Sequence, residues 1–503
     1  MRKFVFLILC SLLASIMTSQ SASAANIYIS FVMMNPSTQA NAGAGQRISL
    51  SLVNRGQNLE AFIKIGAACT KFNSTVTTSG YKYTCIKSGK KLIWGKAVKV
   101  DKATPTPTST PTSVGTSAMQ KITLSSFVSA AQSAIANPES SVPIFDPSGK
   151  VTIAAKSGNG FANFLAANTP DKFSFFGPTP LMETDPNRAG SLSLITLDNR
   201  KVYGSYSALP PWAIGFKLST TDSQGRFNLV TSGSGDLGQT HAWRLAYKEG
   251  SGIWRYQSIS GVSHPNDNQK HFDEVSLGAP GSYSIRLEFE AQTTFYGLGL
   301  SDNAASVTPL LNSSAVRVLV VGDSWVWPSF EESGPHHVWD GYPGALSWLS
   351  GWNVISAGVR GQGYLSISAN ETYKDRIVRD VIPQHPSVVI FTGSSNDHLF
   401  SDQQIAEEMG RDIRVVQEAN PGVLIIACSP YETGGDQKAP GQNQAMKAEA
   451  MRIGVPYIDF INLPLFDQTN NGQQQLSKGH PTRLGSSYVA RILLKEIAAI
   501  NSH

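Results

Sequence analysis

The chain of 503 residues is too long for one ordinary domain, because domains commonly hold roughly 100–200 residues. Apolar residues make up 41% and charged residues 15% of it, with 44 Gly and 27 Pro, which excludes a disordered chain, a coiled coil and a collagen. The net charge of +5 is local: residues 1–100 hold 12 Lys and Arg against one acid, Glu60, and the remainder is acidic. This distribution argues against a nucleic-acid partner.

The N-terminus has the pattern of an export signal. Met1-Arg2-Lys3 is basic, residues 4–17 are apolar, and Ala22-Ser23-Ala24 fits a small-residue cleavage site. The apolar stretch is shorter than the roughly 20 residues that span a bilayer, which disfavours a membrane anchor. The sequence therefore predicts a signal peptide over residues 1–24, a secreted, extracellular protein and no membrane span.

A small basic module is expected over residues 26–100. It holds ten Lys and Arg against one acid, a charge that suits an anionic surface, so association with the cell wall is one hypothesis and a simple aid to solubility is the other. Cys69 and Cys85 are close in sequence, and an oxidising compartment favours a disulfide between them. Cys428 lies in the apolar run 423–428, which is typical of a buried structural thiol.

The next two segments are a linker and a β-rich region. Residues 101–117 are rich in Thr and Pro and have little to bury, which predicts an extended linker. Between residues 118 and 310, stretches such as 212–218 and 285–289 alternate apolar residues with small or charged ones, the period of half-buried strands. We expect a β-sandwich of the jelly-roll kind over 118–310.

The spacing of apolar residues changes over residues 315–503. Short apolar runs, typical of strands covered on both faces, alternate with helical patterns; the runs are 318–321, 388–391, 423–428 and 455–460. This alternation predicts a parallel sheet between two layers of helices, an α/β/α domain.

Three motifs follow these elements. Gly322-Asp323-Ser324 ends the first strand, where open α/β sheets place reacting groups, although a Ser there can also be a simple helix cap. Asn396-Asp397 follows the strand at 388–391, and His480-Pro481-Thr482 precedes the last helix. With these motifs in this order, residues 315–503 resemble the SGNH (GDSL) hydrolases, a family of esterases with a flavodoxin-like fold.

The resemblance implies a role for four residues. Ser324 would be the nucleophile, and His480 the base that takes its proton and returns it to the leaving alcohol. The backbone N–H groups of Ser324 and Gly361 and the side-chain amide of Asn396 would stabilise the oxyanion. Gly358 and Gly363 are rivals for the position of Gly361. No metal or cofactor is implied, and the adjacent pair His336-His337 favours solvent-facing side chains over metal ligands.

Two positions depart from the family pattern. Ser394 stands where the family usually has glycine, two residues before Asn396. Ser477 stands where the family usually has the aspartate that orients the histidine. The carbonyl of Ser477 could take that role, or the acids Asp467, Asp459 or Glu432 could, or activity could be reduced.

The expected function is that of a secreted serine esterase. A β-sandwich directly before an SGNH domain resembles carbohydrate esterases, so the deacetylation of a polysaccharide such as acetylxylan is the first hypothesis. A lipase-like or aryl esterase, an acyltransferase and a non-catalytic glycan- or cell-wall-binding protein are the alternatives. Trp325, Trp327 and Trp339 lie near the nucleophile in sequence and suit either a platform for a sugar ring or packing.

Overall fold

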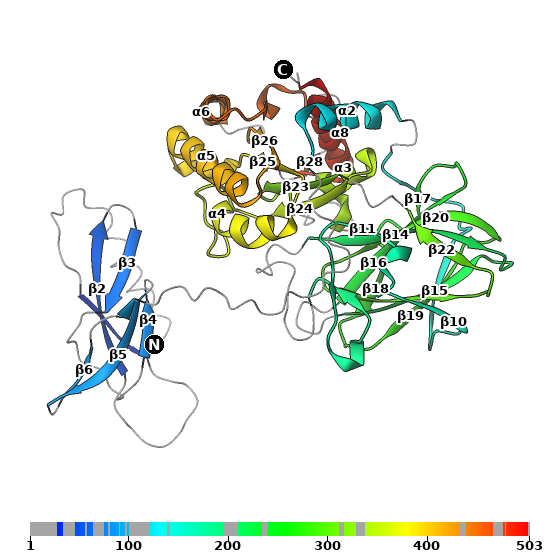
Figure 1. The fold of residues 1–503 in the computed structure, drawn as a ribbon, viewed down its shortest axis with the longest axis horizontal. Helices are drawn as coiled ribbons and strands as arrows, with labels where there is room; N and C mark the ends of the chain where they lie inside the picture. The colour runs from blue at the N-terminus through cyan, green and yellow to red at the C-terminus, as the bar shows by residue number, and fades with distance from the viewer. Residues whose placement is uncertain are drawn as a thin grey trace. The chain divides into compact units, whose positions relative to one another are not determined.

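The chain divides into two compact units, Met1–Thr110 and Pro111–His503. Figure 1 shows the elements of both units in a computed structural model. The structure describes residues 28–33, 46–55, 58–63, 75–78, 81–89, 91–95, 98–99, 121–137, 141–195, 210–233, 240–310, 316–327, 338–431, 439–465, 476–477 and 479–500. Among these residues, no helix combines the length and the apolar character that crossing a bilayer requires.

The first unit contains two small antiparallel sheets. One is formed by β1 (Tyr28–Met33), β2 (Gln46–Arg55) and β3 (Asn58–Ile63), and the other by β4 (Thr75–Thr78), β5 (Tyr81–Ser88), β6 (Lys91–Trp94) and β7 (Val98–Lys99). Cys85 is fully buried on β5. The signal peptide, the linker and Cys69 lie outside the described residues, so the export signal and the Cys69–Cys85 disulfide stay predictions.

The second unit contains a β-sandwich of two sheets that share one apolar core. The order of the first sheet is β12 (Leu181–Met182), β13 (Leu192–Ser193), β21 (Thr293–Leu300), β15 (Arg226–Gly233), β19 (His271–Ser276) and β9 (Thr152–Lys156), with β10 (Asn163–Ala166) on β21. The order of the second is β11 (Ser174–Phe176), β14 (Trp212–Thr220), β20 (Gly281–Phe289), β16 (Thr240–Glu249), β17 (Arg255–Tyr256) and β8 (Ile144–Phe145), with β18 (Val262–Pro265) on β16 and β22 (Ser306–Pro309) on β14.

The alternation in the sequence explains the two faces of the second sheet. On β14, Trp212, Ile214 and Phe216 enter the sandwich core, whereas Gly215 and Lys217 alternate with them and take the outer face. The predicted β-sandwich thus agrees with the observed two-sheet arrangement.

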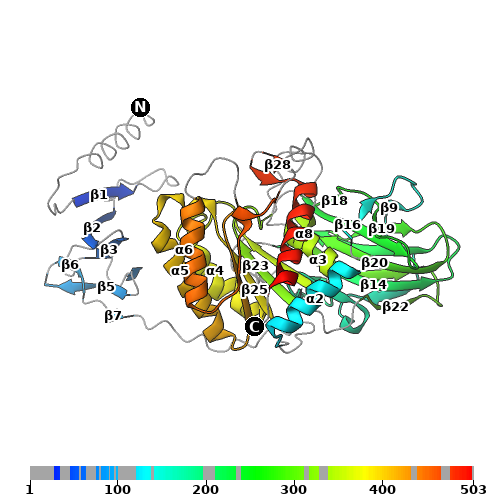
Figure 2. The same cartoon turned by 90° about the horizontal axis from the view of Figure 1, so that it is seen from above.

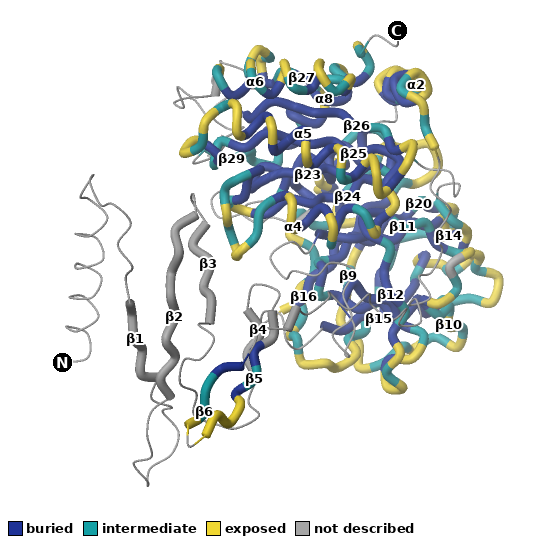
Figure 3. Tube along the Cα trace, turned by 60° about the vertical axis from the view of Figure 1, so that its left-hand side comes forward, coloured by how far each residue is buried: buried dark blue, intermediate teal, exposed yellow. Residues whose placement is uncertain are grey.

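The remainder of the second unit is built around a five-stranded parallel sheet. Its order is β24 (Asn353–Gly358), β23 (Arg317–Gly322), β25 (Val388–Thr392), β26 (Leu424–Cys428) and β27 (Tyr457–Ile458). The first strand of the domain, β23, therefore lies between the second and the third, which is where ligands of such sheets bind. Apart from the first residue of β23, β24, β26 and β27, which is half-buried, the strands are buried, as the dark blue colour in Figure 3 shows.

Helices cover both faces of this sheet. One face carries α3 (Tyr342–Ser350) and α8 (Arg483–Ala499), and the other carries α4 (Tyr373–Arg376), α5 (Asp402–Ala419) and α6 (Ala439–Arg452). Side chains alternate along the strands: Val318 and Val320 pack against α3 and α8, and Leu319 and Val321 face the opposite layer. Cys428 is a fully buried free thiol, as predicted, and burial raises its pKa.

The helix α2 (Leu124–Ala136) differs from the sequence prediction. Residues 118–310 were expected to form the β-sandwich, yet α2 packs against α8 and α3 of the α/β domain (Figure 2). The reason is its apolar face, since Phe127, Ala131 and Ala134 join the core that covers the parallel sheet. The α/β domain therefore recruits a segment from before the sandwich.

Buried charges join the sandwich to the α/β domain. Arg244 on β16 is fully buried, with its Nη2 2.6 Å from Glu288 Oε2 on β20 and its Nη1 2.8 Å from Asp340 Oδ1. Asp340 lies on the short helix η4 (Val338–Asp340), and its Oδ1 is also 3.4 Å from Nε of Arg483, at the start of α8. A buried charge is costly without partners, so separating the β-sandwich from the α/β domain would leave these charges unpaired.

Candidate active site

The turn after β23 holds Ser324 at the carboxyl end of the parallel sheet. The chain leaves the strand at Gly322 and bends at once, because the N–H groups of Val326 and Trp327 both donate to the carbonyl of Asp323, at 3.2 and 2.9 Å. Ser324 is thereby buried at the start of the turn, with 8% of its surface exposed. The strand end thus presents a serine hydroxyl, as predicted.

A histidine lies within hydrogen-bonding distance of that hydroxyl. The distance between Ser324 Oγ and His480 Nε2 is 2.8 Å, although the two residues are 156 positions apart in the sequence. A base so close to a serine can accept its proton as the oxygen attacks a carbonyl carbon. The fold therefore assembles a candidate nucleophile and base.

His480 is presented by a two-stranded hairpin. The strands β28 (Leu476–Ser477) and β29 (His480–Pro481) pair Ser477 directly with His480. Gly479 turns the chain between them with a φ of 78°, a left-handed conformation that favours glycine. The backbone of the residue that replaces the usual aspartate is thus the cross-strand neighbour of the histidine.

Of the three acids that could orient His480, only Asp459 lies among the described residues, and its carboxylate is bound to other groups. Asp459 accepts hydrogen bonds from the side chain of Asn443 at 2.9 Å and from the side chain of Asn462 at 2.8 Å, which fix it as the cap of a short helix, η8 (Phe460–Asn462). Asp467 and Glu432 lie outside the described residues. The Ser477 carbonyl, Asp467 and Glu432 remain predictions for the group that orients His480.

Trp325 connects the nucleophile turn to the histidine hairpin. Its indole Nε1 donates to the carbonyl of Gly479 at 3.1 Å, directly before His480. Its ring stacks on Tyr431 with centroids 4.3 Å apart, and Tyr431 in turn stacks on Phe460 at 5.0 Å. The sequence left Trp325 between a sugar platform and packing; at 5% exposure the structure favours packing and positioning.

Asn396 lies in a polar cluster beside the nucleophile turn. Its Nδ2 donates to the carbonyl of Gln362 at 3.0 Å and to Ser394 Oγ at 2.9 Å. Ser394, at the position where the family has glycine, is fully buried, with its Oγ 2.7 Å from Asp323 Oδ2. The departure from the family pattern therefore adds a hydroxyl that holds Asn396 and the nucleophile turn together.

Burial also affects the acids of this cluster. Burial raises the pKa of Asp323, while hydrogen bonds from Ser394 and from the N–H of Trp325 oppose the shift. Burial likewise raises the pKa of Asp397, although its carboxylate accepts from the backbone N–H groups of residues 364–366 at 2.8–3.1 Å. Asp397 thus anchors the loop that contains Gly361 to the loop that contains Asn396.

The structure assigns different constraints to the three rival glycines. A Cβ on Gly358 would lie 2.0 Å from the N of Trp327, and one on Gly363 would lie 2.3 Å from Asp397 Oδ1, so both are required by close packing. Gly361 has open space except for Ser368 Oγ at 3.3 Å, and its φ of 75° requires a left-handed backbone. Gly361 is therefore required by its backbone conformation and not by close packing.

Two backbone donors remain available at the site. Among the residues that the structure describes, the N–H groups of Ser324 and Gly361 have no hydrogen-bond acceptor. Unpaired N–H groups near a nucleophile suit an oxyanion, because they need no rearrangement as charge develops.

The sequence did not reveal the supporting roles of Gln362 and Asp397, which depend on contacts between separate loops.

The described residues contain no group of three or more His, Cys, Asp or Glu side chains that could hold a metal ion. His336-His337 lies outside them, as does the rest of the loop between Trp327 and η4.

One comparison with known proteins covers the part of the chain that contains this site. Residues 320–487 match the sequence model of the GDSL-like Lipase/Acylhydrolase family. Since the match spans the nucleophile turn, the Asn396 loop and the histidine hairpin, the C-terminal domain is a GDSL-like lipase/acylhydrolase domain, as the sequence resemblance predicted.

Three solved structures are similar to this chain. A family two carbohydrate esterase from Cellvibrio japonicus is 13% identical, with a TM-score of 0.47 and coverage of 69% of this chain and 99% of that one. An acetyl xylan esterase from the rumen bacterium Butyrivibrio proteoclasticus is 12% identical, with a TM-score of 0.43 and coverage of 66% and 97%. A salicylyl-acyltransferase from a tetracycline biosynthetic pathway is 11% identical, with a TM-score of 0.45 and coverage of 67% and 98%. No curated protein matches the chain.

Proposed function

We propose that this protein is a serine esterase that hydrolyses carboxylic esters through an acyl-Ser324 intermediate. The observation that carries the proposal is the 2.8 Å contact between Ser324 Oγ and His480 Nε2 inside a GDSL-like domain. The N–H groups of Ser324 and Gly361, which have no acceptor among the described residues, support it.

The proposed reaction has two halves. Ser324 Oγ attacks the ester carbonyl while His480 Nε2 takes its proton, and a tetrahedral oxyanion forms. Collapse of the oxyanion breaks the bond to the alcohol, which leaves with the proton from His480. Water then attacks the acyl-serine, again through His480, to release the acid and restore Ser324. Each oxyanion donor contributes about 3 kcal/mol to lowering the barrier.

For the substrate we propose an acetylated polysaccharide. The support is the domain plan: a β-sandwich precedes the GDSL-like domain and is joined to it by the buried pairs of Arg244 with Glu288 and Asp340. An acetyl group also suits a nucleophile that is only 8% exposed, because a small acyl group needs little space.

The test is a screen of p-nitrophenyl esters of increasing acyl length together with acetylated xylan. The proposal expects the highest kcat/KM for the acetyl ester and release of acetate from xylan. A preference for long acyl chains, with xylan untouched, would identify a lipase-like enzyme instead. Products that carry the acyl group on an added sugar acceptor would identify an acyltransferase.

We further propose that the protein is exported and held at an anionic cell envelope by its basic module. Residues 26–100 carry ten Lys and Arg against one acid, and such binding is screened as ionic strength rises. Raising the salt concentration should release the protein from envelope preparations. Retention at high salt would contradict binding by charge.

A further inference from the structure

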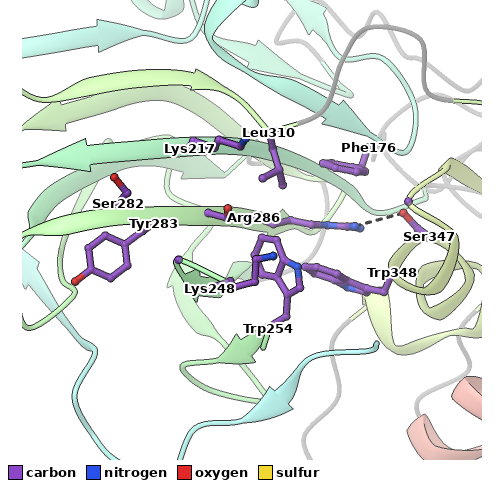
Figure 4. A pocket seen from close by; sticks show the side chains of 13 residues that line it. Phe176, Lys217, Lys248, Trp254, Ser282, Tyr283, Arg286, Leu310, Ser347 and Trp348 are labelled. Carbon is purple, nitrogen blue, oxygen red and sulfur yellow. Dashed lines mark hydrogen bonds between the residues drawn. The ribbon is translucent and has the colours of Figure 1, made fainter. Parts of the chain in front are cut away.

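A pocket of about 470 Å³ lies between the β-sandwich and helix α3, and the site described above does not use it. Figure 4 shows its residues: β14, β16 and β20 contribute one wall, and the end of α3 closes it. Its volume is in the range of ordinary small-molecule sites. The lining residues are Phe176, Lys217, Lys248, Gly250, Trp254, Ser282, Tyr283, Ser284, Arg286, Leu310, Ser347, Trp348 and Gly351.

Three cations gather on the wall formed by the sheet. The strand register places Ser284 opposite Lys217 on one side and opposite Lys248 on the other, so two lysines flank one small residue. Neighbouring strands are about 4.8 Å apart, which puts the Cα atoms of the lysines roughly 10 Å apart. Arg286, two residues along β20 from Ser284, extends the same face.

Arg286 is the deepest of these cations, with 1% of its surface exposed. Its Nη1 lies 3.3 Å from Ser347 Oγ and its Nε forms an ion pair with Glu288, but its Nη2 has no hydrogen-bond acceptor among the described residues. Its guanidinium lies 4.2–4.3 Å from the ring centroids of Phe176, Trp339 and Trp348. Aromatic faces stabilise the charge but leave the N–H donors unused.

The acid Glu288, on the same strand as Arg286, is already paired. Glu288 Oε1 lies 3.4 Å from Arg286 Nε, while its other oxygen lies 2.6 Å from Arg244 and also accepts from Arg244 Nε at 2.9 Å. The lining residues themselves include no acid. The three positive charges on this sheet face repel one another. An anion bound among them would reduce that repulsion, so the pocket is an electrostatically favourable place for an anion.

The other lining groups suit a sugar. Trp254 and Trp348 provide aromatic surface, with centroids 4.9 Å apart, and Ser282, Ser284 and Ser347 provide hydroxyl groups. Sugar rings present apolar C–H faces to aromatic rings and hydroxyl groups to polar ones.

We propose that this pocket binds an anionic sugar residue, so that the polysaccharide recognised by this protein carries acidic groups. Lys217, Lys248 and Arg286 would contact the anionic group, and the aromatic wall would contact the ring. The inference rests on the proposed function for the expectation that the ligand is a glycan.

The pocket is a subsite separate from the nucleophile. It includes Gly351, two residues before β24 begins, and therefore lies toward the amino ends of the parallel strands, whereas Ser324 follows the carboxyl end of β23. A strand of six residues is about 20 Å long. The pocket would therefore hold a part of the polymer distant from the ester being cleaved.

Calorimetric titration of the full chain tests the subsite. The probes are an unacetylated oligogalacturonide, its neutral carboxyl-reduced counterpart, and galactose 6-phosphate. We expect at least one acidic probe to bind and the neutral one not to. In K217A/K248A the affinity for that acidic probe should fall at least about tenfold, since each lysine supplies a charge-assisted contact.

The matched control is K156A/K270A, which removes Lys156 at the end of β9 and Lys270 directly before β19, two strands of the other sheet of the sandwich. Comparing the two double variants also distinguishes binding at the pocket from binding at the basic module, because neither variant changes residues 26–100. Equal affinities in the two double variants, equal binding of the neutral probe, or no binding of either acidic probe would overturn the proposal. A preference between the two acidic probes would show whether carboxylate or phosphate is the anion.

The titration needs no ester bond. A negative result therefore leaves the proposed esterase intact, whereas hydrolysis that survives in Ser324→Ala would refute the esterase and leave the subsite intact.

Discussion

Replacing Trp325 with Phe removes one hydrogen bond next to the candidate base. The indole N–H donates to the carbonyl of Gly479 at 3.1 Å, and a phenyl ring keeps the stack on Tyr431 without that donor. A hydrogen bond of this kind contributes about 1 kcal/mol net, and 1.4 kcal/mol corresponds to a factor of ten. If the bond positions His480, kcat should fall roughly fivefold and KM should change little.

The assay is p-nitrophenyl acetate hydrolysis, with Tyr431→Phe as the matched control. That control removes the bond between the hydroxyls of Tyr431 and Tyr342, at 2.8 Å in the same aromatic cluster, and leaves Gly479 untouched. Tyr431→Phe should lose about 1 kcal/mol of stability and Trp325→Phe more, because the smaller ring also leaves a cavity, but only Trp325→Phe should lose kcat. Equal losses of kcat in the two variants, or full activity in Trp325→Phe, would refute a positioning role.

Four further predictions concern the site and the stability of the fold. Asn396→Ala should lower kcat by about 10²–10³-fold with an unchanged circular dichroism spectrum, because it removes the side-chain amide proposed to stabilise the oxyanion. Asp467→Asn should leave the rate unchanged if the Ser477 carbonyl orients His480; a loss of about 10⁴-fold would instead identify Asp467 as the triad acid. Arg244→Met should lower the free energy of unfolding in urea by about 3–5 kcal/mol, since it leaves buried carboxylates without their partner, whereas the half-exposed Arg226→Met should cost less than about 1 kcal/mol. Burial raises the pKa of Asp412 from 3.8 to about 8, so the folded state binds a proton more tightly than the unfolded state and stability should fall as pH rises from about 4 to 8. Asp412→Asn should flatten that decline in urea unfolding measured at pH 5 and pH 8.

The sequence predicted the α/β domain well because its signals are local. Short apolar runs marked β23, β25 and β26, since each of these strands is covered on both faces. The helix α2 was not assigned to this domain, because its apolar face does not reveal which core it joins. Only the packing of Phe127 against the layer of α3 and α8 decides that.

In the candidate site too, the residues with local motifs could be predicted from the sequence, whereas the contacts between distant segments could not. Ser324, Asn396 and His480 could be selected because their motifs are short and continuous in the sequence. The contacts that hold them in place, such as Trp325 with Gly479 and Ser394 with Asp323, join segments separated by tens of residues or more. Such contacts depend on the order of strands in the sheet, which no single segment specifies.

Hydrolysis of p-nitrophenyl acetate by Ser324→Ala, with Ser401→Ala as the control, tests whether Ser324 is the nucleophile. Ser401 caps α5 and its substitution should leave turnover unchanged. We expect a loss of at least about 10⁴-fold in kcat for Ser324→Ala, together with an acetyl group found by mass spectrometry on Ser324 of the wild-type protein quenched during turnover. Turnover by Ser324→Ala at the wild-type rate would contradict this role of Ser324.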